Sequence, residues 1–105
     1  MSRDSSRLIM ELDKYRREIN REKINPTLDT VDMNVLSPVV RICAKARASY
    51  IECLMGIAED DSGDLCSSAQ IDQLRQHRLA YEELVEAANA LETVVKRGYV
   101  DVKEH

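Results

Sequence analysis

The sequence predicts an all-α fold, a three-helix bundle or hairpin with a long C-terminal helix, and we expect the chain to form a homodimer. The chain contains no Phe, no Trp, three Gly and two Pro among 105 residues. The aromatic residues that fill pleated sheets are therefore scarce. Apolar residues instead recur at helical spacing in three segments, which we assign as helices over about 4–24, 38–58 and 68–97. The length fits a single helical domain over 1–105.

The first predicted helix covers residues 4–24. Asp4 or Ser5 can cap its N-terminus, and Asn25 before Pro26 is expected to end it. Its apolar residues form one narrow seam at spacings of three and four: Leu8, Leu12, Tyr15 and Ile19. Charged residues occupy the other faces. Such a helix is marginal alone, so we expect it to lie on one or two others.

The connection over residues 25–37 is long for a helical hairpin and unusually apolar. Val31, Met33 and Val35 alternate with polar residues, which is strand spacing. Two interpretations remain open. These residues cover the open side of the bundle, or they present an exposed apolar strip to a partner.

The central helix, 38–58, carries two apolar stripes. Ser37 is its expected N-cap and Pro38 its first residue. The first stripe consists of Val39, Cys43, Ala46, Tyr50, Cys53 and Ile57. The second stripe consists of Val40, Ala44, Ala48, Ile51, Met55 and Ala58. Because a surface helix needs only one stripe, we expect a core helix covered by more than one neighbour.

The third helix, 68–97, begins with a capping-box pattern at Ser67 and Gln70 and ends at Gly98. Its seam is Ile71, Leu74, Tyr81, Leu84, Ala88, Leu91 and Val95. A helix over 68–97 is about 45 Å long, whereas a domain of this size is roughly 34 Å across. Either the helix breaks, or part of its stripe meets another chain. The tail over 99–105 is expected to be loose.

No group of residues in the sequence forms a recognisable catalytic, cofactor or metal site. His77 lies in the third seam without a second His or a paired carboxylate at helical spacing. Cys43 and Cys53 are about 15 Å apart along one helix, too far to share a zinc ion. Cys66 is the one cysteine expected to be exposed, and its acidic surroundings disfavour the thiolate. We therefore expect no cofactor.

Two alternatives to a binding protein remain open. A small dimeric enzyme of the chorismate-mutase type would need basic residues converging from different helices, and Arg41, Lys45, Arg47, Arg75 and Arg78 are the candidates. A nucleic-acid-binding helical dimer is the second alternative, but the formal net charge of −4 opposes direct nucleic-acid binding.

The remaining interpretation is a non-enzymatic module for protein–protein interaction. It would bury apolar surface against another protein inside a charged rim. The expected partner-binding residues are Val31, Met33, Ala44, Ala48, Ile51 and Met55.

The sequence also predicts a cytoplasmic location. No apolar run approaches the ~20 residues of a membrane span, and the N-terminal residues lack the apolar core of a signal peptide. Three cysteines, an odd number without CxxC spacing, fit a reducing compartment.

The opening MSRDSSRLIMELDKYRR and the central SPVVRICAKARASYIECLMGIAEDD resemble the small quorum-sensing anti-activators of pseudomonads. The resemblance covers essentially the whole chain but contains no signature motif. It implies a helical, dimeric protein that binds the ligand-binding domain of a LuxR-type receptor such as LasR. Occupying the receptor's dimerisation surface would keep that transcription factor from DNA.

Overall fold

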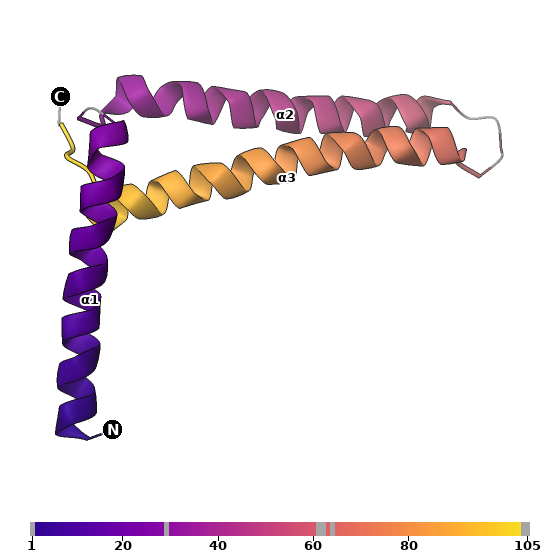
Figure 1. The fold of residues 1–105 in the computed structure, drawn as a ribbon. Helices are drawn as coiled ribbons and strands as arrows, with labels where there is room; N and C mark the ends of the chain where they lie inside the picture. Colours follow the sequence, from indigo (N-terminus) through magenta and orange to yellow (C-terminus); the bar gives the residue numbers. More distant parts are fainter. Residues whose placement is uncertain (1, 29, 61–62, 64, 104–105) are drawn as a thin grey trace. The chain divides into compact units, whose positions relative to one another are not determined.

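The chain folds into three α-helices, as a computed structural model covering residues 2–28, 30–60, 63 and 65–103 describes. They are α1 (Arg3–Ile24), α2 (Met33–Glu59) and α3 (Ser68–Lys96), with a short 3-10 turn, η1 (Asn25–Thr27), after α1 (Figure 1). Among the described residues, extended pairing is confined to an isolated parallel bridge between Val31 and Val102. The all-α prediction is confirmed.

The chain divides into two compact units. Unit 1 comprises Met1–Leu36 and Leu91–His105, and unit 2 comprises Ser37–Ala90. Unit 1 therefore holds α1, the first turn of α2, the last turns of α3 and the C-terminal tail. Unit 2 holds the remainder of α2 and α3, which form an antiparallel hairpin.

Helix α1 begins earlier than predicted because Ser2 caps it. The Ser2 hydroxyl accepts a hydrogen bond from the Ser5 backbone N–H at 3.1 Å. Asp4 and Ser5 lie inside the helix, so their assignment as caps was wrong. The predicted end is confirmed, since α1 stops at Ile24 and η1 contains Pro26.

Helix α2 also begins earlier, at Met33 rather than at Pro38. The Asp32 carboxylate accepts hydrogen bonds from the backbone N–H groups of Asn34 and Val35, at 2.9 and 3.2 Å. An Asp cap satisfies the unpaired donors of the first turn. The assignment of Ser37 as N-cap was therefore wrong, Pro38 lies inside the helix, and residues 33–37 belong to α2 rather than to the connection.

The predicted ends of α3 are confirmed. The Ser67 hydroxyl accepts from the Gln70 N–H at 3.1 Å, and the Gln70 side chain accepts from the Ser67 N–H at 2.9 Å. At the other end Gly98 has φ 71°. The Gly98 N–H donates to the Val95 carbonyl and the Tyr99 N–H to the Val94 carbonyl, which is the Schellman arrangement.

The buried residues of the described chain all lie in unit 1. Val31 is 1% exposed, Val100 3% and Tyr99 8%. The Val31 N–H donates to the Asp101 carbonyl at 2.8 Å, and the Lys103 N–H donates to the Val31 carbonyl at 2.9 Å. The prediction of a loose tail is thus wrong for residues 99–103, and residues 104–105 lie outside the described range. Among the described residues, the segment with strand spacing around Val31 forms the single bridge to Val102.

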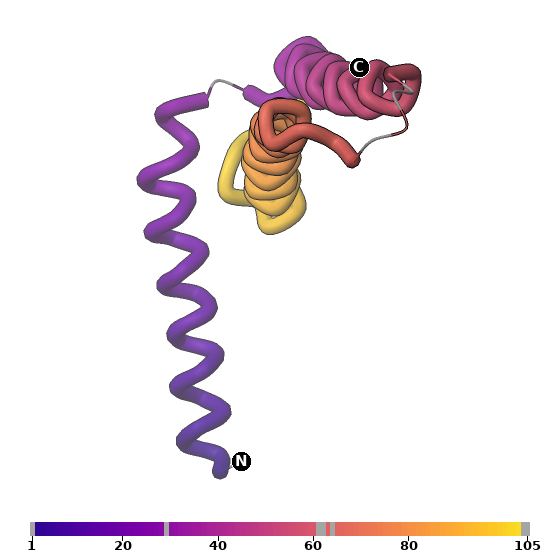
Figure 2. The backbone as a smooth tube through the Cα atoms, turned by 90° about the vertical axis from the view of Figure 1, so that its right-hand side faces the viewer, coloured from indigo at the N-terminus to yellow at the C-terminus, as the bar shows by residue number. Residues whose placement is uncertain are grey.

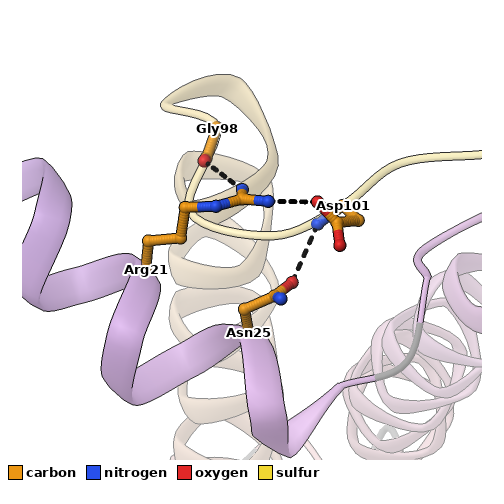
Figure 3. A network of polar contacts seen from close by, with 4 residues as sticks. All are labelled: Arg21, Asn25, Gly98 and Asp101. Atoms are coloured by element: carbon orange, nitrogen blue, oxygen red, sulfur yellow. Dashed lines mark hydrogen bonds and ion pairs between the residues drawn. The ribbon is translucent and has the colours of Figure 1, made fainter.

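A polar network joins α1 to the tail (Figure 3). Arg21 donates a hydrogen bond to the Gly98 carbonyl at 2.9 Å and forms an ion pair with Asp101. The Asp101 backbone N–H donates to the Asn25 side-chain oxygen at 3.0 Å. The hydrogen bond from Arg21, followed by its positive charge, lowers the pKa of Asp101. We call these four residues the tail network.

Candidate protein-binding surface

In unit 2, α3 covers one side of α2, the side that carries the first stripe. All six residues of that stripe are half-buried. Figure 2 shows the two helices of the hairpin side by side, and the Cys43 thiol lies 3.6 Å from the Leu84 carbonyl oxygen of α3. The predicted seam of α3 is half-buried as well, except for Ile71, which is 49% exposed. Cys43 and Tyr50 of the first stripe thus meet Leu84 and Tyr81 of the α3 seam within the hairpin, whereas Leu91 and Val95 of that seam belong to unit 1.

Tyr81 is the centre of this contact. Its ring lies 6.2 Å from that of Tyr50 on α2, with the planes inclined by 35°. The Arg47 guanidinium donates to the Tyr81 hydroxyl at 2.6 and 3.0 Å and lies 5.3 Å from the centre of its ring. The tilted contact of the two rings, the hydrogen bonds and the cation–π attraction thus hold α2 and α3 in register at this level.

The second stripe of α2 is uncovered. Val40 is 64% exposed, Met55 51% and Ile51 49%, and the three alanines of the stripe are exposed too. Helix α2 has no buried residue. The expectation of a core helix covered by more than one neighbour is therefore wrong within this chain, because only the first stripe is packed in the hairpin.

Charged residues run beside the second stripe with opposite signs in its two halves. The four residues are Arg41, Lys45, Glu52 and Glu59. The first two are four positions apart, and each later residue follows seven positions after the one before it. These spacings place all four on one side of the helix. All four are exposed. The ion pairs found among the described residues involve none of them. We call these four residues the charged flank.

The structure brings together four of the six predicted partner-binding residues. Ala44, Ala48, Ile51 and Met55 share the uncovered face of α2 in unit 2. Met33 is 57% exposed but lies in unit 1, and Val31 is buried and cannot meet a partner in this conformation. Of the two interpretations of the connection, burial therefore holds for Val31.

Sequence reasoning left Val40 and the charged flank out of the site. The sequence contains a feature that marks Val40 and another that marks the charged flank. Val40 lies one turn before Ala44 and is the most exposed large residue of the stripe. The charged flank is visible as a change of sign along one face of α2, basic before residue 46 and acidic after residue 51.

An open groove of about 450 Å³ lies between α2 and α3 near the tip of the hairpin. It is lined by Ser49, Glu52, Cys53, Gly56, Ile57, Asp60, Gln70, Gln73 and His77. No Arg or Lys contributes to this lining, so it offers no cationic site for a dicarboxylate. Across the described residues, no cluster of three or more His, Cys, Asp or Glu side chains could hold a metal ion.

The basic residues that a mutase-type site would use either have other partners in unit 2 or are exposed. Arg47 is bound to Tyr81, and Arg78 lies 3.9 Å from Glu82 on its own helix. Arg41, Lys45 and Arg75 are exposed. The three cysteines are free thiols, with Cys66 exposed as expected.

Comparison with known proteins adds no relative. No family model, curated protein or solved structure matches the chain significantly. Within the described part of the chain, none of the helices combines enough length with enough apolar character for a bilayer crossing.

Proposed function

We propose that this protein is a non-enzymatic interaction module that binds another protein through the second stripe of α2. The observation that carries the proposal is the exposure of that stripe, with Val40, Ile51 and Met55 each about half exposed or more. A contiguous apolar face on a soluble surface marks an interaction site.

The shape of the stripe fits a partner helix or a groove. From Val40 to Ala58 it extends about 27 Å along the axis of α2. Ala44 and Ala48 permit close approach in one half, while Ile51 and Met55 supply larger side chains in the other. Amphipathic helices bind apolar grooves through residues at this spacing. The charged flank sets the orientation of the partner on α2. A partner that places acidic residues near Arg41 and Lys45 and basic residues near Glu52 and Glu59 is favoured.

The partner we propose is a LuxR-type transcription factor in the cytoplasm. The resemblance to quorum-sensing anti-activators supports this choice. In this mechanism a dimer of the present chain binds the receptor's ligand-binding domain and covers the surface through which the receptor dimerises. The receptor then fails to bind DNA.

The test is capture of a purified receptor ligand-binding domain, such as that of LasR, by the full chain, with binding measured by calorimetry. Met55→Glu and Ile51→Glu place a charge in the centre of the stripe and should weaken binding at least tenfold, as expected for central interface residues. Met10→Glu is the matched control, because Met10 is 72% exposed and lies on α1. Circular dichroism verifies that each variant keeps its helices.

A gel shift with receptor and operator DNA then measures function. The wild-type chain should release the receptor from DNA, and Met55→Glu should not. Absence of binding by the wild-type chain would exclude a LuxR-type partner. If Met55→Glu instead dissociates the protein into monomers, the second stripe is a surface for a second copy, and the assignment to a receptor is wrong.

A further inference from the structure

The apolar seam of α1 is uncovered in this chain. Leu8 is 64% exposed, Leu12 47%, Tyr15 54% and Ile19 37%. Helix α1 has no buried residue. Helices in proteins gain most of their stability from the packing of an apolar face rather than from helix propensity. An occupant for this seam would therefore stabilise it.

The contacts that α1 makes inside unit 1 lie on the opposite face. In a heptad with Leu12 and Ile19 at a and Leu8 and Tyr15 at d, Arg17 falls at f and Arg21 at c. Arg21 belongs to the tail network, and a Cβ at Gly98 would lie 3.1 Å from the Arg17 guanidinium. The tail thus binds the outer face of α1 and leaves the seam and its two borders accessible.

The two borders of the seam carry opposite charges. Glu11 and Glu18 occupy consecutive g positions on one border. Arg16 and Lys23 occupy consecutive e positions on the other. All four are exposed, although Arg16 also contacts Asp13 of its own helix at 3.0 Å. Residues at e and g set the partner and the orientation of paired helices.

This pattern is complementary to a second copy in one orientation. In a parallel, in-register pair, a g residue meets the e residue five positions later on the other helix. Glu11 then faces Arg16 of the second copy, and Glu18 faces Lys23. In an antiparallel pair g meets g and e meets e, so carboxylates would face carboxylates and cations would face cations.

We propose that α1 is the self-association surface of this protein, with two copies pairing their α1 helices in parallel and in register. The occupant of the α1 seam is thus a second copy of this chain. The proposal concerns unit 1 alone and does not depend on a receptor binding to α2.

The first test is the mass of the full chain by light scattering and sedimentation over a range of concentrations. The wild-type chain should reach twice 12.0 kDa. Leu12→Lys, at the centre of the seam, should raise the dimer Kd at least tenfold. Met10→Lys is the matched control, since Met10 lies at f, and it should leave the Kd unchanged. A monomeric wild-type chain, or an unchanged Kd for Leu12→Lys, overturns the proposal.

Charge exchange provides a test that unfolding cannot imitate. E11K/E18K and R16E/K23E should each raise the homodimer Kd about tenfold or more, because each variant brings like charges together. An equimolar mixture of the two variants should form heterodimers about as tightly as the wild type. If the mixture stays as weak as its components, these four residues do not pair between copies.

Disulfide trapping shows whether the two α1 helices pair in parallel or antiparallel. In a C66S background, Leu8→Cys and Ile19→Cys should each give a disulfide-linked homodimer under mild oxidation, since equal positions face each other in a parallel pair. The C66S chain without a further substitution is the control, because it measures how much disulfide-linked dimer Cys43 and Cys53 form by themselves. Trapping only in a mixture of the two variants indicates an antiparallel pair and overturns the proposal.

Discussion

Compared with the hairpin of unit 2, unit 1 has little regular structure outside α1, yet it contains all the buried residues of the described chain. Val31, Tyr99 and Val100 are buried there between segments from both ends of the sequence. In unit 2, two long helices pack side by side, and the residues of their facing seams remain half-buried. The helical content of a region therefore does not determine how many of its residues are buried.

Geometry explains the difference. Two helices touch along a line, so each contact residue has the facing helix on one side and water on the other. In unit 1, the tail is hydrogen-bonded to the segment around Val31 on one hand and to Arg21 and Asn25 on the other, so several segments meet there. A residue enclosed from several directions loses its solvent contact, whereas one enclosed from a single direction does not. The hairpin accordingly has apolar surface left for a partner.

The strongest test of this comparison is a charge at Val31. Val31→Asp would bury a carboxylate without a partner, and we expect it to lower the free energy of unfolding by about 3–5 kcal/mol. Urea denaturation followed by circular dichroism measures the change. Val102→Asp is the matched control, because Val102 lies across the bridge but is 54% exposed. It should cost about 0.5 kcal/mol or less, and equal losses for both variants would show that unit 1 has no true core.

A smaller effect is expected at Tyr81, the centre of the hairpin contact. Tyr81→Ala removes a half-buried ring and should cost about 2 kcal/mol. Tyr81→Phe keeps the ring, loses the hydrogen bonds from Arg47, and should cost about 0.5–1 kcal/mol. The same denaturation experiment applies. If Tyr81→Ala costs as much as Val31→Asp, the hairpin contains a core that the half-buried positions do not reveal.

The smallest effect concerns the pH dependence of the tail network. Arg21 lowers the pKa of Asp101, so this carboxylate stabilises the folded chain above its ordinary pKa of about 3.9. That stability is lost as the pH falls through the lowered, folded-state pKa. Hydrogen exchange of the Lys103 amide should therefore become less protected in acid than at neutral pH. Asp101→Asn should show the weaker protection already at neutral pH, with a flatter pH response.

Much of the fold could be predicted from the sequence because its signals are local. The capping box at Ser67, the stop at Gly98 and the break at Pro26 each depend on residues a few positions apart. The two stripes of α2 follow from spacing alone, and the structure places them on different faces. The apolar character of the face with Ala44, Ala48, Ile51 and Met55 was identifiable for the same reason, but its exposure was not.

The errors arose where a competing or distant partner decides the outcome. Pro38 is compatible with a first helical turn, but the Asp32 cap starts α2 earlier and the helix accommodates the proline. The tail was expected to be loose because no local pattern shows that Val31, Tyr99 and Val100 meet. The coverage of α2 was overestimated because spacing reveals that a face is apolar, not which molecule covers it.

The tail network has a consequence for the order of folding. Arg21 and Asp101 are 80 positions apart in the chain, whereas Asp60 and Gln70 at the hairpin tip are 10 apart and joined by a 3.0 Å hydrogen bond. Closing the longer loop costs more chain entropy and is slower. We expect the α2–α3 hairpin to form first during folding and the contacts between the two chain ends to form last. In pulsed deuterium labelling after refolding, the amides of Val31 and Lys103 should be the latest to gain protection.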